Sequence, residues 1–145
     1  MFIKQISVFL ENIPGTLREM TSILSAGGID IRELSIADTQ SFGIVRLIVR
    51  SDSIDRAMEL LKGAGYMARI NHVICAEIPD APSGLCGLLG IIEENGLSVE
   101  YMYSCRRTPE GNALMVLRLS EQDRGCTCLR ARGVRVYNQE EVDKL

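Results

Sequence analysis

A short loop sequence that could hold an anion occurs twice in this chain of 145 residues. The first copy, Glu11 to Leu17, reads Glu-Asn-Ile-Pro-Gly-Thr-Leu, and the second, Pro79 to Leu85, reads Pro-Asp-Ala-Pro-Ser-Gly-Leu. Each copy follows an alternating apolar run and precedes a stretch with helical spacing, so each predicts a loop from a strand to a helix. Backbone N–H groups at a helix start lack intrahelical partners and lie at the positive end of the helix dipole, which suits a carboxylate ligand.

Polar groups beside these loops match the backbone end of a free amino acid. The predicted donors for a carboxylate are the backbone N–H groups of Gly15, Thr16, Leu17, Gly84 and Leu85. The predicted acceptors for an ammonium group are side-chain oxygens of Asn12, Asp30, Asp80 and Ser98. Residues of these types also cap helices and stabilise turns without any ligand, and the sequence leaves both interpretations open.

The repeat extends well beyond the loops, at a constant offset of 68 residues, as from Pro14 to Pro82. Further identical pairs at this offset are Leu17 and Leu85, Gly28 and Gly96, Gly43 and Gly111, Arg50 and Arg118, and Gly65 and Gly133. No gap is needed, so we infer an internal duplication and two domains, residues 1–71 and 72–145.

Hydrophobic spacing predicts the same element order in both copies. The first copy predicts a strand over residues 3–10 and then a helix that Leu17 opens and Gly27-Gly28 ends. Strands over 29–38 and 42–50, joined at Thr39 to Ser41, follow, and a helix after Asp52 and a strand over 66–70 complete the copy. Thr16 and Glu19 have the spacing of a capping box. The second copy predicts strands over 73–78, 97–106, 112–120 and 134–137, helices over 85–95 and 122–131, and a polar peripheral tail. This order is that of a ferredoxin-like βαββαβ unit of the α+β class.

Composition excludes several classes of protein. The formal net charge of −3 leaves no basic excess for nucleic acid. No apolar run is long enough to span a membrane, and the N-terminus lacks the pattern of a signal peptide. Five irregularly spaced cysteines favour thiols in a reducing cytoplasm. His72, the single histidine, has no partner motif for catalysis, and Cys126 with Cys128 lacks the second ligand pair of a zinc site, so neither a cofactor nor a metal is expected.

The loop, helix and following Gly-Gly-Ile-Asp-Ile of the first copy resemble the ACT domain, a small-molecule-sensing module of amino-acid metabolism. The second copy, with Asn-Gly-Leu-Ser-Val after its helix, resembles another. The resemblance implies paired domains side by side in an eight-stranded antiparallel sheet with helices on one face, and a ligand where the loop of one unit faces the second strand of its partner. Carried over by position, Asn12, Ile13, Pro14, Gly15, Thr16 and Leu17 would face Ser98, and Asp80, Ala81, Pro82, Ser83, Gly84 and Leu85 would face Asp30. Ser83 replaces the usual glycine, which puts equal affinity of the two sites in doubt.

These features predict a cytoplasmic regulatory protein that binds a free amino acid and is not an enzyme. Homodimerisation and a metabolic enzyme as partner are expected, and neither nucleic acid nor membrane is. One alternative is an interaction subunit of a metabolic enzyme that binds no ligand itself. Another is a small enzyme that uses Asp80, Cys86 or His72, although no acid-base or nucleophile pairing in the sequence supports it.

Overall fold

The computed structural model describes residues 1–38 and 42–145, so the predicted hairpin tip, Thr39 to Ser41, lies outside the described residues. The chain forms two compact units. The N-terminal unit comprises Lys4–Asn71, and the C-terminal unit comprises Met1–Ile3 together with His72–Leu145. No helix among the described residues is long and apolar enough to cross a membrane.

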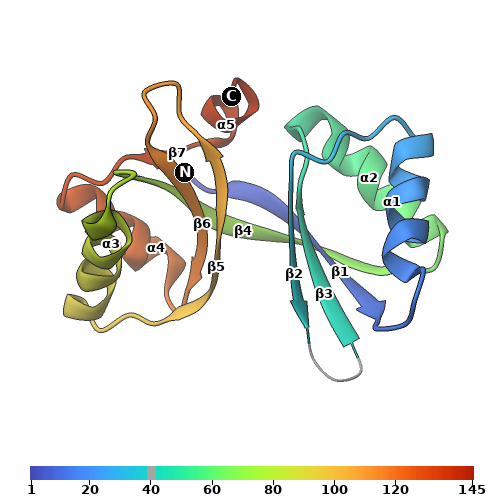
Figure 1. The fold of residues 1–145 in the computed structure, drawn as a ribbon, viewed down its shortest axis with the longest axis horizontal. Helices are drawn as coiled ribbons and strands as arrows, with labels where there is room; N and C mark the ends of the chain where they lie inside the picture. Colours follow the sequence, from blue (N-terminus) through green and yellow to red (C-terminus); the bar gives the residue numbers. More distant parts are fainter. Residues whose placement is uncertain (39–41) are drawn as a thin grey trace. The chain divides into compact units, whose positions relative to one another are not determined.

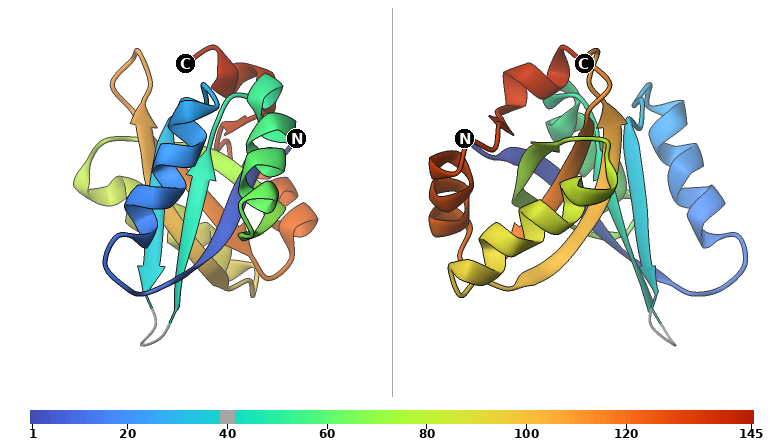
Figure 2. Two further views of the ribbon diagram at one scale, coloured as in Figure 1. Left: turned by 90° about the vertical axis from the view of Figure 1, so that its right-hand side faces the viewer. Right: turned by 60° about the vertical axis from the view of Figure 1, so that its left-hand side comes forward.

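The N-terminal unit is an antiparallel sheet whose strands follow the order β2-β3-β1-β4. Its elements are β1 (Ile3–Glu11), α1 (Thr16–Ala26), β2 (Glu33–Asp38), β3 (Phe42–Ile48), the 3-10 turn η1 (Ser51–Ser53), α2 (Ile54–Gly63) and the first part of β4 (Met67–Ile78). Helices α1 and α2 lie side by side over one face of these strands (Figure 1, Figure 2). The second strand begins later than residue 29, the predicted start.

The core of this unit follows the predicted periodicities. Alternate residues of β1 (Ile6, Val8 and Leu10) are buried against the helices. On α1, Met20 and Leu24 are fully buried, one turn apart on the same stripe. The apolar residues predicted for the second helix (Ile54, Ala57, Met58 and Leu61) supply the buried face of α2. Burial of this continuous apolar layer positions α1, and with it the loop that precedes the helix.

The C-terminal unit repeats the plan on the second part of β4. Its further elements are α3 (Pro82–Glu94), β5 (Val99–Arg107), β6 (Ala113–Leu119), α4 (Gln122–Ala131), β7 (Val136–Tyr137) and α5 (Gln139–Asp143). The strand order is β4-β6-β5, and β7 pairs with β4. Figure 2 shows α3 and α4 beside the strands of this unit. A core of apolar side chains, among them Ile74, Leu88, Leu117 and Leu129, joins the helices to the sheet.

One continuous strand replaces two that the sequence predicted separately. β4 runs from Met67 to Ile78 without interruption, because neither Asn71 nor His72 introduces a turn and the Ser7 hydroxyl donates to the Asn71 amide oxygen over 2.8 Å. Each unit uses part of this strand, so the described residues form seven strands and the predicted count of eight is wrong.

The polar tail was predicted to be peripheral, but it forms a short capped helix. The Asn138 side chain accepts from the Glu141 backbone N–H over 3.0 Å, and the Glu141 carboxylate accepts from the Asn138 N–H over 2.8 Å, a complete capping box. Val142 is buried, so the tail adds an apolar contact that its composition concealed.

Packing at Gly125 leads to a stability prediction. A Cβ atom there would collide with Cδ1 of Leu119, a buried core side chain that has little room to move. Alanine has the better helix propensity by about 1 kcal/mol, but overpacking typically costs about 1–3 kcal/mol. We therefore expect Gly125→Ala to lower the free energy of unfolding in urea. Gly90→Ala on α3, where the new methyl meets open space, is the control and should be neutral or stabilising.

Candidate functional site

The first repeated loop connects β1 to α1 through a left-handed glycine. Gly15 has φ +93°, a conformation that side chains other than glycine rarely adopt, and it is the N-cap of α1. The Thr16 hydroxyl donates to the carbonyl oxygens of Glu11 and Ile13, at 3.0 Å each. The predicted capping box of Thr16 and Glu19 is therefore wrong, because Thr16 is already the first helical residue and its hydroxyl points back into the loop. These bonds hold the loop against the end of β1.

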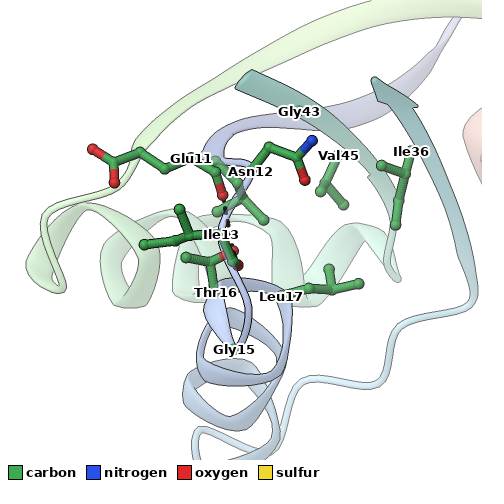
Figure 3. A pocket seen from close by; sticks show the side chains of 10 residues that line it. Glu11, Asn12, Ile13, Gly15, Thr16, Leu17, Ile36, Gly43 and Val45 are labelled. Atoms are coloured by element: carbon green, nitrogen blue, oxygen red, sulfur yellow. Dashed lines mark hydrogen bonds between the residues drawn. The ribbon is translucent and has the colours of Figure 1, made fainter. Parts of the chain in front are cut away.

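A cavity opens between this loop and strands β2 and β3 of the same unit. It has a volume of about 450 Å³, including space open to solvent. Its walls are formed by the end of β1, the loop, the first turn of α1 and the facing strand residues: Leu10, Glu11, Asn12, Ile13, Gly15, Thr16, Leu17, Ile36, Gly43 and Val45. Figure 3 shows Asn12, Leu17, Ile36 and Val45 gathered on one side of the loop, whereas the Glu11 carboxylate extends toward the other side.

Five of the six residues predicted in this loop line the cavity, all but Pro14. The sequence missed the residues from the strands, namely Leu10, Ile36, Gly43 and Val45, and also Glu11. The sequence did single out Gly43, because an identical residue, Gly111, occurs at the repeat offset of 68 residues. The others could be found only from strand register, which places Gly43 opposite Leu10, and Val45 opposite both Val8 and Ile36.

The strand residues predicted to complete the sites lie away from the loop of their own unit. Asp30 precedes β2, whose first residue Glu33 pairs with Ile48, at the end of the sheet opposite Glu11 and Phe42. Ser98 precedes β5 in the same way, and its N–H and carbonyl bond to the Ser120 hydroxyl and N–H, at 3.2 and 3.0 Å. Neither residue can therefore serve the loop of its own unit.

The second repeated loop has a different geometry. α3 begins at Pro82, earlier than the predicted start at residue 85, because proline is favoured in the first turn of a helix. The Gly84 N–H donates to the Ala81 carbonyl over 2.9 Å. A Cβ atom at Gly84 would collide with the Pro79 carbonyl oxygen, so this loop folds tightly onto the helix. Its first turn thus differs from the turn held open by Gly15.

An internal ion pair engages the carboxylate of the second loop. The Arg107 guanidinium contacts the Asp80 carboxylate with an Nη1–Oδ2 distance of 2.6 Å. Both side chains are largely exposed, so the pair adds little to stability. The Asp80 carboxylate was predicted to accept a hydrogen bond from a ligand's ammonium group. In this structure it binds the Arg107 guanidinium instead.

A half-buried carboxylate, that of Glu77, lies near the end of β4 in the C-terminal unit. Glu77 accepts from Tyr137 Oη and from Asn112 Nδ2, both at 2.7 Å, and Arg135 lies 4.4 Å from the Tyr137 ring centroid. Burial raises the pKa of Tyr137 to about 12, and the hydrogen bond and charge of Glu77 act in the same direction. Each of these polar groups has a partner within the cluster, which indicates a structural role that ties β7 to β4.

His72 and Cys86, two of the residues weighed for catalysis, are exposed. The His72 carbonyl accepts from Arg118 and Gln122, at 3.1 and 2.9 Å. Cys126 is buried in α4, where burial raises the pKa of its thiol, and the Cys128 thiol donates to the Asn95 side chain over 3.2 Å. Over residues 1–38 and 42–145, no cluster of three His, Cys, Asp or Glu side chains could hold a metal ion.

Comparisons with known proteins bear on this geometry. The family model of the ACT domain pair matches residues 1–144. The crystal structure of protein BT0572 from Bacteroides thetaiotaomicron is 34% identical, with a TM-score of 0.88 over 100% of this chain and 98% of that chain. The regulatory subunits of aspartate kinase from Thermus thermophilus (18% identity, TM-score 0.66, 90% of each chain) and Thermus flavus (17%, 0.64, 88% of each) share the fold. No curated protein matches the sequence.

The Tyr137 cluster predicts a loss of stability in alkali. The folded state holds the Tyr137 proton up to about pH 12, whereas an unfolded tyrosine releases it near pH 10. The contribution of the protonated Tyr137 hydroxyl to the free energy of unfolding is therefore complete below about pH 10 and is lost between about pH 10 and 12. We expect Tyr137→Phe to lower the free energy of unfolding by about 1.5–3 kcal/mol at pH 8, and this difference to shrink as the pH rises through that window. Urea unfolding at pH 8, 10 and 11.5 measures it. A difference that is independent of pH would contradict the assignment.

Proposed function

This chain belongs to the ACT domain pair family, and from that premise we propose that it is a regulatory protein that binds a free amino acid at its N-terminal loop. The observation that carries the proposal is the cavity between α1 and the strands, which is lined by the loop residues whose chemistry pointed to such a ligand. That Asp30 and Ser98 contribute to a ligand site from a partner domain remains a prediction from family position.

The ligand's carboxylate binds the first turn of α1 in this proposal. The backbone N–H groups of Thr16 and Leu17 lack intrahelical partners, and the Thr16 N–H reaches the Ile13 carbonyl only at 3.5 Å, too long for a strong hydrogen bond. The Asn12 side-chain oxygen then accepts from the ammonium group. Gly15 supports this arrangement because it lines the cavity and its left-handed conformation directs the chain into the first turn of α1.

One site per chain follows from the different first turns of the two helices that the loops precede. Ser83, the counterpart of Gly15, lies within α3 and cannot reproduce the left-handed turn at the same cost. We therefore assign ligand binding to the N-terminal loop and a structural role to the second.

Regulation is proposed to act through a partner protein. A ligand that joins the loop to β2 and β3 stabilises one arrangement of α1 over others, and a partner that senses α1 gains or loses affinity by the same coupling free energy. The regulatory subunits of aspartate kinase, which share this fold, support a metabolic enzyme as the class of partner. We further propose that the chain has no catalytic activity of its own and functions as a homodimer in the cytoplasm.

A thermal-shift screen of the full chain against the twenty amino acids tests the proposal. A ligand at a hundredfold excess over its dissociation constant should stabilise the protein by about 2.7 kcal/mol. We expect Asn12→Ala to weaken binding about tenfold or more, because a hydrogen bond to a charged group contributes about 1.5–3 kcal/mol. Titration calorimetry should give one ligand per chain.

Asp80→Ala is the matched control, since it removes the corresponding side chain of the second loop. It should leave the shift and the stoichiometry unchanged. If Asp80→Ala abolished the shift and Asn12→Ala did not, the second loop would be the working site. If a folded protein responded to no amino acid, a subunit that binds only a partner would replace the proposal.

A further inference from the structure

The cavity walls beyond the loop are apolar. Ile36 on β2, Val45 on β3, and Leu10 and Leu17 at the two ends of the loop supply them. Ile36 is 50% exposed although it lies on the face that carries the core, so the cavity ends at a hydrophobic rim. In Figure 3 the Leu17, Ile36 and Val45 side chains lie around the same space.

Among the described lining residues, none places a charged side chain on this wall. The Glu11 carboxylate, the single charged group among the lining residues, extends away from Ile36 and Val45 (Figure 3). A polar or charged side chain placed against the wall would lose contact with water without gaining a hydrogen-bond partner, which is unfavourable. An aliphatic side chain placed there would bury apolar surface on both partners.

The depth of the cavity depends on Gly43, which has no side chain to fill it. Gly43 pairs directly with Leu10 and lines the cavity, so a Cβ atom at residue 43 would lie on the same face of the sheet as the Leu10 side chain. Such a Cβ would meet the Ala37 carbonyl oxygen at 3.8 Å and Ile36 Cγ2 at 4.0 Å, both ordinary van der Waals contacts. Gly43 is also not among the glycines with positive φ. An alanine can therefore occupy this position without strain.

We infer that the amino acid bound at the N-terminal loop has an aliphatic side chain, of the valine, isoleucine and leucine class, and that Gly43 sets the largest size admitted. This inference rests on the proposed function, because the loop must first hold the ligand's carboxylate and ammonium groups. It adds the side-chain class and names a residue that determines specificity.

Titration calorimetry on the full chain and two matched variants tests the inference. The ligands are alanine, valine, isoleucine and leucine, with serine, asparagine, glutamate and lysine as the polar set. The unmodified protein should bind one of the aliphatic amino acids at least about tenfold more tightly than every polar one, the range over which apolar pockets discriminate by a methylene or more. Gly43→Ala should weaken binding of that best ligand by about tenfold and shift the preference to a smaller aliphatic amino acid.

Gly63→Ala at the end of α2 is the control, because its new methyl meets open space and lies outside the cavity lining. It should keep the affinities and the order of preference of the unmodified protein. A polar amino acid that binds best, or a Gly43→Ala variant with the same preference as Gly63→Ala, would overturn the inference and leave the proposed function standing. If no amino acid bound any of the three proteins, the proposed function would fail, and the side-chain class with it.

Discussion

The antiparallel pairing of β1 with β3 is the constraint on which the N-terminal unit and its cavity depend. In this register Ile6 pairs with Leu47 and Val8 with Val45, so the apolar residues of both strands form one surface for α1 and α2. The same register places Gly43 opposite Leu10, at the end of the sheet where the chain turns toward α1. A shift of one residue would expose the core and fill the hollow beside the loop, because side chains alternate between the two faces of a strand.

The two repeated loops show how a duplicated site can diverge through a few substitutions. Glycine at residue 15 permits a left-handed turn before α1, whereas the second copy, with Ser83 in its place, continues the helix back to Pro82. The second copy also pairs Asp80 with Arg107. In the proposed function, one copy retains the ligand and the other contributes a stable helix start. This division is consistent with the tight approach of Gly84 to the Pro79 carbonyl.

In the C-terminal unit, a cluster of polar side chains around Glu77 stabilises the fold. Glu77 is held by Tyr137 and Asn112, and Arg135 also reaches Glu141 on α5 over 3.4 Å. Partial burial of a carboxylate is costly unless it is hydrogen-bonded, and the cluster supplies these bonds while it ties β7 to β4 and to α5. The two units therefore share one architecture, and only the C-terminal unit adds this half-buried polar network of Glu77, Asn112, Arg135 and Tyr137.

The sequence by itself determined the duplication, the order of strands and helices, the family and half of one cavity lining. These features depend on local rules: hydrophobic period, Pro and Gly at turns, and a fixed repeat offset. Tertiary structure alone decided that β4 is continuous, that Thr16 bonds backward instead of capping, and that Asp80 meets Arg107. It also decided that Ile36, Gly43 and Val45 join the loop. Those outcomes depend on strand register and on contacts between residues distant in the chain, which no local pattern encodes.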